Sequence, residues 1–222
     1  MLLQLAVDRP EHFAVVPRVA DLVDIVEVGT PVLKRFGASA ITTLRELAPG
    51  VPVLADTKTV DGGLLEAEMV HTSGATMMTV LACASAATHC TVGEFADRHG
   101  LIVVADTITT TGTTPLLPVG QTFPAGYGYV AVHFPSDQRL AGDSSTAHID
   151  AVEDMHALGH RVSLAGGIST DNIDAAVAVA PEIVVVGSGI TEADDPRGVT
   201  EWIRSRLSEP GRGWPSTPSP PS

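Results

Sequence analysis

Cysteine, aromatic residues and long apolar runs are all scarce in this sequence, and each shortage excludes a class of protein. The 222 residues include only two cysteines, Cys83 and Cys90, too few for a disulfide framework or for a zinc site of their own. We expect both to be buried thiols in a reducing compartment. No apolar run approaches the roughly 20 residues of a membrane-spanning helix, and residues 1–8 lack the basic start of a signal peptide. These absences predict a soluble, cytoplasmic protein.

Positive charge is scarce as well. The sequence has 13 lysine and arginine residues against 26 aspartate and glutamate residues, which gives a formal net charge of −13. Such a chain repels polyanions, so we expect it to bind neither nucleic acid nor a membrane. A phosphate group can still be bound locally, because backbone N–H groups can hold it.

Eight short runs of small aliphatic residues alternate with longer amphipathic segments. Each run is almost continuously apolar, which is typical of parallel strands covered on both faces. The predicted strands are Leu2–Val7, Asp24–Val28, Val53–Asp56, Met77–Leu81, Leu101–Asp106, Tyr129–His133, Arg161–Ala165 and Ile183–Val186. The predicted helices are Pro31–Leu47, Gly63–Thr72, Ser85–His99, Ser145–Leu158, Asp171–Ala180 and Asp195–Leu207.

This alternation predicts an α/β fold with a parallel sheet. A doubly wound open sheet is one possibility, but eight evenly spaced strands favour a single (β/α)8 TIM barrel over residues 1–207. The segment 107–128 contains three prolines and four glycines, so we expect an irregular crossover with a short helix near 116–119 at most. Residues 208–222 contain five prolines and predict a disordered tail.

Aspartate ends three of the odd-numbered predicted strands. Asp8 follows the first strand, Asp56 ends the third and Asp106 ends the fifth. In a barrel these strand ends meet on the catalytic face. The alternative is that each aspartate only caps the helix that follows its strand.

The segment Asp56-Thr57-Lys58-Thr59-Val60-Asp61 carries the sharpest catalytic pattern. Lys58 is one of only two lysines in the chain, and it lies between two aspartates where a strand ends. Carboxylates hold an ammonium group charged and oriented, and such a lysine can stabilise an oxyanion or deliver a proton. The alternative is a structural ion pair at the barrel rim.

Two further residues extend this candidate site. Glu27 ends an apolar strand, where a buried carboxylate needs a cation or hydrogen-bond donors. Glu27 and Asp56 would lie side by side on adjacent strands, and such a pair of oxygen ligands suits Mg²⁺; a Glu27–Lys58 salt bridge is the alternative. Of eight histidines, only His133 ends a strand, so it is the candidate general acid or base.

Glycine pairs follow the last two predicted strands. Gly166 and Gly167 come after the seventh strand, and Gly187 and Ser188 come after the eighth. In (β/α)8 barrels the loops after these strands often bind phosphate through backbone N–H groups, and glycine lets the backbone approach the anion.

These motifs together resemble the orotidine-5′-phosphate decarboxylase superfamily. The resemblance rests on Asp56-x-Lys58-x-x-Asp61, on Glu27-Val28-Gly29-Thr30-Pro31 before it and on Ala165-Gly166-Gly167-Ile168 after it. Within the superfamily the chain is most similar to the 3-hexulose-6-phosphate synthases, to which the segment Leu3–Asp8 is also similar. The similarity covers about residues 1–207.

The resemblance implies a homodimeric barrel enzyme with active sites shared between subunits. The implied reaction is an aldol addition of D-ribulose 5-phosphate to formaldehyde, or its reversal, through an enediolate stabilised by Mg²⁺. The implied roles are metal ligand for Glu27 and Asp56, contact with the enediolate for Lys58, contact with the partner's site for Asp61, hydroxyl binding for Asp8, proton transfer for His133, and phosphate binding for Gly166, Gly167, Gly187 and Ser188.

Two other functions remain open from the sequence. The 3-keto-L-gulonate-6-phosphate decarboxylases of the same superfamily have nearly the same site, and a non-catalytic sugar-phosphate binder would keep the fold. Phe134-Pro135 follows His133, where the synthases usually carry a small Thr-Gly-type pair and the decarboxylases usually carry arginine. Ser188 stands where the decarboxylases tend to have arginine. The missing arginines favour the synthase.

Overall fold

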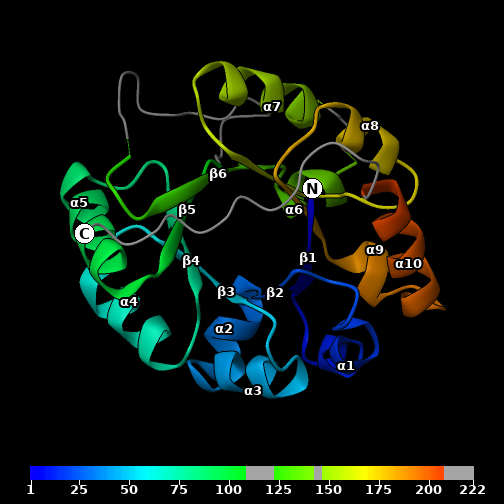
Figure 1. The fold of residues 1–222 in the computed structure, drawn as a ribbon, viewed down its shortest axis with the longest axis horizontal. Coiled ribbons are helices and arrows are strands. Elements are labelled where there is room, and N and C mark those ends of the chain that lie inside the picture. The colour runs from blue at the N-terminus through cyan, green and yellow to red at the C-terminus, as the bar shows by residue number, and fades with distance from the viewer. Residues whose placement is uncertain (109–122, 143–146, 208–222) are drawn as a thin grey trace, which may run out of the picture.

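Eight parallel strands close into a barrel, and the helices form a ring around it (Figure 1). The structure is a computed structural model that describes residues 1–108, 123–142 and 147–207. The strands are β1 (Leu2–Val7), β2 (Ile25–Val28), β3 (Val53–Thr59), β4 (Met77–Leu81), β5 (Ile102–Asp106), β6 (Tyr127–His133), β7 (Val162–Ala165) and β8 (Ile183–Val186). Each strand pairs with the next, and β8 pairs with β1. The predicted barrel is therefore confirmed, and the open sheet is excluded.

All eight predicted strands are present, and the largest difference is at the end of β3. The prediction ended this strand at Asp56, whereas β3 continues to Thr59. Its pairing with β4 shifts register between Ala55 and Thr59, and Lys58 has a φ of 48°. This irregularity turns the Lys58 backbone at the rim of the barrel.

The described helices are η1 (Pro10–Ala14), α1 (Val16–Val19), α2 (Thr30–Phe36), α3 (Ser39–Leu47), α4 (Gly63–Thr72), α5 (Ala86–His99), α6 (Ser136–Leu140), α7 (Ala147–Ala157), α8 (Ile173–Ala178), α9 (Ser188–Thr191) and α10 (Pro196–Leu207). The single helix predicted over 31–47 is wrong. It is split because Gly37, with a φ of 62°, ends α2 by donating its N–H to the carbonyl oxygen of Leu33. The short helices η1, α1, α6 and α9 were not predicted.

The hydrophobic core has two parts. The larger part fills the space between the strands and the helices, and the smaller part lies inside the barrel. Inside the barrel, the even-numbered strands contribute a buried apolar layer of Ile25, Met77, Tyr129 and Ile183. This layer closes the interior below the candidate site.

Of the remaining predictions, one is wrong and others concern residues that the structure does not describe. Cys83 and Cys90 are both exposed, so the expectation of buried thiols is wrong. The possible helix near 116–119 and the tail 208–222 lie outside the described residues, so the division of the chain at residue 207 stays a prediction. In the described part of the chain, no helix has the length and apolarity required to cross a membrane.

Candidate active site

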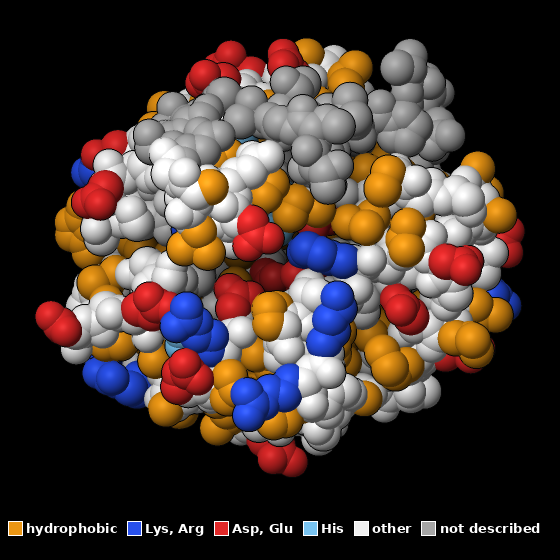
Figure 2. Space-filling model, turned by 180° about the vertical axis from the view of Figure 1, so that it is seen from behind, with side chains coloured by type: hydrophobic (Ala, Val, Ile, Leu, Met, Phe, Trp, Pro, Cys, Tyr) orange, Lys and Arg blue, Asp and Glu red, His pale blue; other side chains and the backbone are white. Residues whose placement is uncertain are grey.

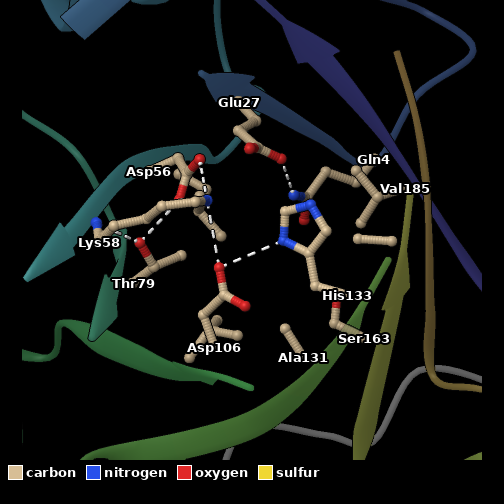
Figure 3. A pocket seen from close by; sticks show the side chains of 13 residues that line it. Gln4, Glu27, Asp56, Lys58, Thr79, Asp106, Ala131, His133, Ser163 and Val185 are labelled. Atoms are coloured by element: carbon tan, nitrogen blue, oxygen red, sulfur yellow. Dashed lines mark hydrogen bonds and ion pairs between the residues drawn. The ribbon is translucent and has the colours of Figure 1, made fainter. Parts of the chain in front are cut away.

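A pocket opens inside the barrel at the carboxyl ends of the strands. On the face drawn in Figure 2, acidic and basic side chains surround a hollow. The pocket encloses about 300 Å³ between its walls, a volume that includes open solvent. Its lining residues, drawn in Figure 3, are Gln4, Glu27, Leu54, Asp56, Lys58, Thr79, Val104, Asp106, Ala131, His133, Ser163, Ala165 and Val185.

Strand alternation explains why these side chains share one pocket. Inward-facing residues of a barrel come from every second position, and alternate strands supply each layer. The floor consists of one residue from each odd-numbered strand: Gln4, Leu54, Val104 and Ser163. The next inward positions of β3 and β5 are Asp56 and Asp106, so the charged groups stand above a partly apolar floor.

Lys58 lies between two buried aspartates. Its Nζ is 2.7 Å from Oδ2 of Asp56 and 3.1 Å from Oδ2 of Asp106. Burial alone would lower the pKa of Lys58, but the two carboxylates outweigh it and raise the pKa above the usual lysine value. Lys58 is therefore charged at neutral pH, and its ion pairs are with the aspartates and not with Glu27.

Thr79 on β4 links the backbone of Lys58 to the carboxylate of Asp56. Its Oγ1 accepts a hydrogen bond from the Lys58 N–H at 2.9 Å and donates one to Oδ1 of Asp56 at 2.8 Å. Thr30 donates a hydrogen bond to the other carboxylate oxygen of Asp56 at 2.7 Å. These contacts fix the positive-φ turn at Lys58 and the orientation of Asp56. Neither threonine was predicted, because no sequence pattern marks such partners.

Asp106 connects Lys58 to His133. Its Oδ2 is 3.2 Å from Nδ1 of His133, while its Oδ1 accepts a hydrogen bond from the Ile108 N–H at 2.9 Å. Burial raises the pKa of Asp106, but the charges of His133 and Lys58 and the N–H of Ile108 together bring it well below the usual range. The repeat of aspartates at strand ends had marked Asp106, but no role was assigned to it.

Glu27 lies on the other side of the pocket, beside Gln4. It is 9% exposed and accepts a hydrogen bond from Nε2 of Gln4 at 2.5 Å. Burial, followed by the charges of Asp56 and Asp8, raises its pKa well above the ordinary glutamate value. The surroundings of Glu27 are thus short of positive charge, which a cation between Glu27 and Asp56 would supply.

The donor set fits a hard divalent cation with few protein ligands. Two carboxylates on adjacent strands face one pocket, and carboxylate oxygens are the ligands that Mg²⁺ prefers. Within the described residues, no group of three or more His, Cys, Asp or Glu side chains is arranged to hold a metal ion. Substrate oxygens or water would have to complete the coordination.

Asp8 directly follows β1 and stands at the mouth of the pocket, above Gln4. Its carboxylate lies against Gly29 and Gly187: a Cβ atom on Gly187 would be 3.4 Å from Oδ2 of Asp8, and one on Gly29 would clash with Oδ1. Asp8 is exposed to solvent, but partial burial of its carboxyl group raises its pKa, and the charge of Asp56 raises it further.

The two glycine loops lie against each other next to this mouth. Gly166 and Gly167 have φ values of 100° and 73°, which favour glycine. A Cβ atom on Gly189 would be 2.9 Å from the carbonyl oxygen of Ile168, so the loop after β8 packs against the loop after β7. Gly187 is the N-cap of α9. The structure thus brings the predicted phosphate-binding residues together.

Asp61 lies apart from the pocket, from Asp8 at its mouth and from the glycine loops. It is exposed, follows β3 and precedes α4. It does not line the pocket, and within the described part of the chain its carboxylate makes no hydrogen bond or ion pair.

A lysine, a histidine and several carboxylates at the carboxyl ends of barrel strands define a (β/α)8-barrel enzyme. The particular family follows from comparison of the whole chain with known proteins. Residues 1–203 match the family model described as Orotidine 5′-phosphate decarboxylase / HUMPS family, and the chain belongs to this family.

Individual members of this family are similar to the chain over nearly its full length. A 3-hexulose-6-phosphate synthase of Staphylococcus epidermidis is 34% identical over 210 residues, which cover 93% of this chain and 99% of that protein. The crystal structure of 3-hexulose-6-phosphate synthase from Salmonella typhimurium has a TM-score of 0.82 and 37% identity, with coverage of 93% of this chain and 98% of that one. The crystal structure of 3-keto-L-gulonate-6-phosphate decarboxylase from Vibrio cholerae has a TM-score of 0.75 and 26% identity, with coverage of 96% and 99%.

Proposed function

We propose that the protein is a 3-hexulose-6-phosphate synthase, a lyase of the aldolase type that condenses formaldehyde with D-ribulose 5-phosphate. The observation that carries this proposal is the 34% identity to a synthase of that name over nearly the full length of both chains. The acid–base groups inside the barrel support it, because an aldol addition needs a proton removed from carbon and a proton delivered to oxygen. The cytoplasmic location stays a prediction.

Glu27 and Asp56 would hold Mg²⁺, which, when bound, lowers the energy of negative charge on adjacent sugar oxygens. Lys58 would place its ammonium group beside the same oxygens. Because Asp56 and Asp106 keep it charged, Lys58 acts as a fixed positive charge beside those oxygens.

His133 would move the protons of the reaction. Its Nδ1 faces Asp106, and this contact fixes the orientation of the ring. Removal of a proton from C1 of D-ribulose 5-phosphate gives the enediolate of the sugar. C1 then attacks the carbonyl carbon of formaldehyde, a C–C bond forms, and the former carbonyl oxygen takes up a proton.

The phosphate of the sugar would lie at the glycine loops after β7 and β8. Gly166, Gly167, Gly187 and Ser188 would offer backbone N–H groups there. Asp8, close to Gly187, would bind a hydroxyl group of the sugar between the phosphate and the reacting carbon.

A second copy of the chain would cover the exposed face beside Asp61. Four apolar side chains are exposed there, with exposed fractions of 52% for Val60, 38% for Leu64, 72% for Leu65 and 37% for Met69. Such a cluster beside a charged residue is typical of a protein–protein interface. In a homodimer built on this face, Asp61 would extend into the partner's site, and sedimentation of the purified protein tests the dimer.

A pair of assays tests the function. Consumption of formaldehyde is measured with D-ribulose 5-phosphate and Mg²⁺, and release of CO₂ is measured with 3-keto-L-gulonate 6-phosphate. We expect activity in the first assay, its loss with EDTA, and its recovery with Mg²⁺ or Mn²⁺. Activity only in the second assay would identify a decarboxylase, inactivity in both would favour a sugar-phosphate binder, and full activity after exhaustive chelation would contradict the role of Glu27.

A further inference from the structure

Gln4 contributes a buried amide to the floor of the pocket. It is 2% exposed, and Figure 3 shows its side chain extending from β1 into the space between Glu27 and His133. Its Nε2 donates to Oε2 of Glu27 at 2.5 Å. The amide nitrogen faces Glu27 in this contact, so the amide oxygen is turned away from that carboxylate.

The amide oxygen of Gln4 has no hydrogen-bond donor within the described residues. An unsatisfied buried acceptor is destabilising, so its partner is expected to enter the pocket from solution. Leu54 and Val104, which share the floor, are apolar and cannot supply a donor. Ser163 is the only other polar residue of this layer, and no hydrogen bond joins it to Gln4.

The depth of Gln4 indicates which end of a ligand it meets. Gln4 and Asp8 are four residues apart on the same extended segment, about 13 Å along the chain, which places Gln4 about 10 Å deeper because barrel strands are tilted. The candidate phosphate loops lie at the level of Asp8, because Gly187 is next to its carboxylate. A sugar phosphate with its phosphate at the mouth would therefore turn its opposite end toward Gln4.

We propose that Oε1 of Gln4 accepts a hydrogen bond from the hydroxyl group on C1 of the bound ketose phosphate. This inference rests on the proposed function, in which C1 is the carbon that forms the new bond. The same amide group holds Glu27, so Gln4 ties the reacting end of the sugar to one of the metal-binding carboxylates. A ketose phosphate with a methyl group at this end would leave the amide oxygen without a donor.

Equilibrium binding of two ligands tests the proposal. D-ribulose 5-phosphate and its 1-deoxy analogue are titrated calorimetrically, with Mg²⁺ present, into wild type and into Gln4→Met, which has a similar length but no amide. In wild type we expect the analogue to bind about tenfold more weakly, as the loss of one buried hydrogen bond implies. In Gln4→Met we expect most of this tenfold difference between the two ligands to disappear, because the contribution of the amide is lost.

Ser163→Ala is the matched control, because it removes the other polar group of the floor and should leave the tenfold discrimination in place. Thermal unfolding and binding of inorganic phosphate show whether Gln4→Met is folded with an intact mouth. Discrimination that persists in Gln4→Met, or equal binding of both ligands by wild type, would overturn the role of Gln4 alone; the wild-type comparison decides this even if the variant does not fold. Failure of wild type to bind D-ribulose 5-phosphate would overturn the proposed function as well.

Discussion

Replacement of Thr79 by valine removes one hydroxyl group that makes two contacts. The hydroxyl accepts from the Lys58 N–H and donates to Asp56, at 2.9 and 2.8 Å. Valine has nearly the same shape, so the packing of β4 should persist. The N–H of Lys58 would lose its partner while its φ of 48° remains unfavourable for a residue with a side chain.

The size of the effect follows from these contacts. A hydrogen bond contributes about 0.5–1.5 kcal/mol, and one to a charged group about 1.5–3 kcal/mol. We therefore expect Thr79→Val to lower the free energy of unfolding by about 2–4 kcal/mol, and the melting temperature by about 5–15 °C for a domain of this size. Turnover should fall at least tenfold, since Asp56 and Lys58 both lose a positioning contact.

Thermal and urea unfolding, together with kcat and KM in the formaldehyde assay, check this prediction. Thr79→Ser keeps the hydroxyl group and should restore most of the stability and turnover. A Thr79→Val protein with unfolding free energy and kcat close to wild type would refute the reasoning. A serine variant as impaired as the valine variant would show that the methyl group of Thr79 matters and not its hydroxyl.

Four further predictions concern the glycine loops, the shared site and the buried aspartate. Gly166→Ala should destabilise the barrel, because its φ is 100° and its Cβ would clash with a backbone oxygen. Gly187→Ala should instead raise KM for the sugar phosphate while the barrel stays folded, because its Cβ would meet protein atoms only at 3.4 Å or more; an unchanged KM would place the phosphate elsewhere. Mixed dimers of Lys58→Ala and Asp61→Ala, with subunit exchange verified by tagged chains, should recover about a quarter of wild-type activity; no recovery would mean that Asp61 acts within its own subunit. The lowered pKa of Asp106 contributes stability that is present above about pH 4 and is lost as the pH falls further. In Asp106→Asn, the free energy of unfolding should therefore depend less steeply on pH in the acid range. Urea titrations at several pH values that show an unchanged pH dependence would contradict this.

Much of the barrel could be predicted because its strands are buried on both faces. Such strands read as continuous apolar runs, and β1, β4 and β8 have the predicted bounds. The end of β3 could not be predicted, because Thr57, Lys58 and Thr59 are polar and their extended pairing depends on Thr79 from the neighbouring strand. The break between α2 and α3 depends on the left-handed conformation of Gly37, which local periodicity does not reveal.

The candidate site, like the barrel, could be predicted only in part. Glu27, Asp56, Lys58 and His133 were predicted because a charged residue at the end of an apolar strand contrasts with its surroundings, and the structure places all four in one pocket. Gln4 lies within a strand, and a single amide there does not stand out in the sequence as a charged residue at a strand end does. Its importance depends on which atoms fail to find partners, and this is known only after the fold brings β1 beside β2.

The apolar layer of Ile25, Met77, Tyr129 and Ile183 gives the pocket a closed lower end. Under the proposed function, two reactants would have to arrive through one opening, and the sugar phosphate, bound from the mouth to Gln4, would fill most of it. The joined product would then have to leave before either reactant can be replaced. We therefore expect a defined order of addition and release, which initial-rate kinetics with both reactants varied would detect.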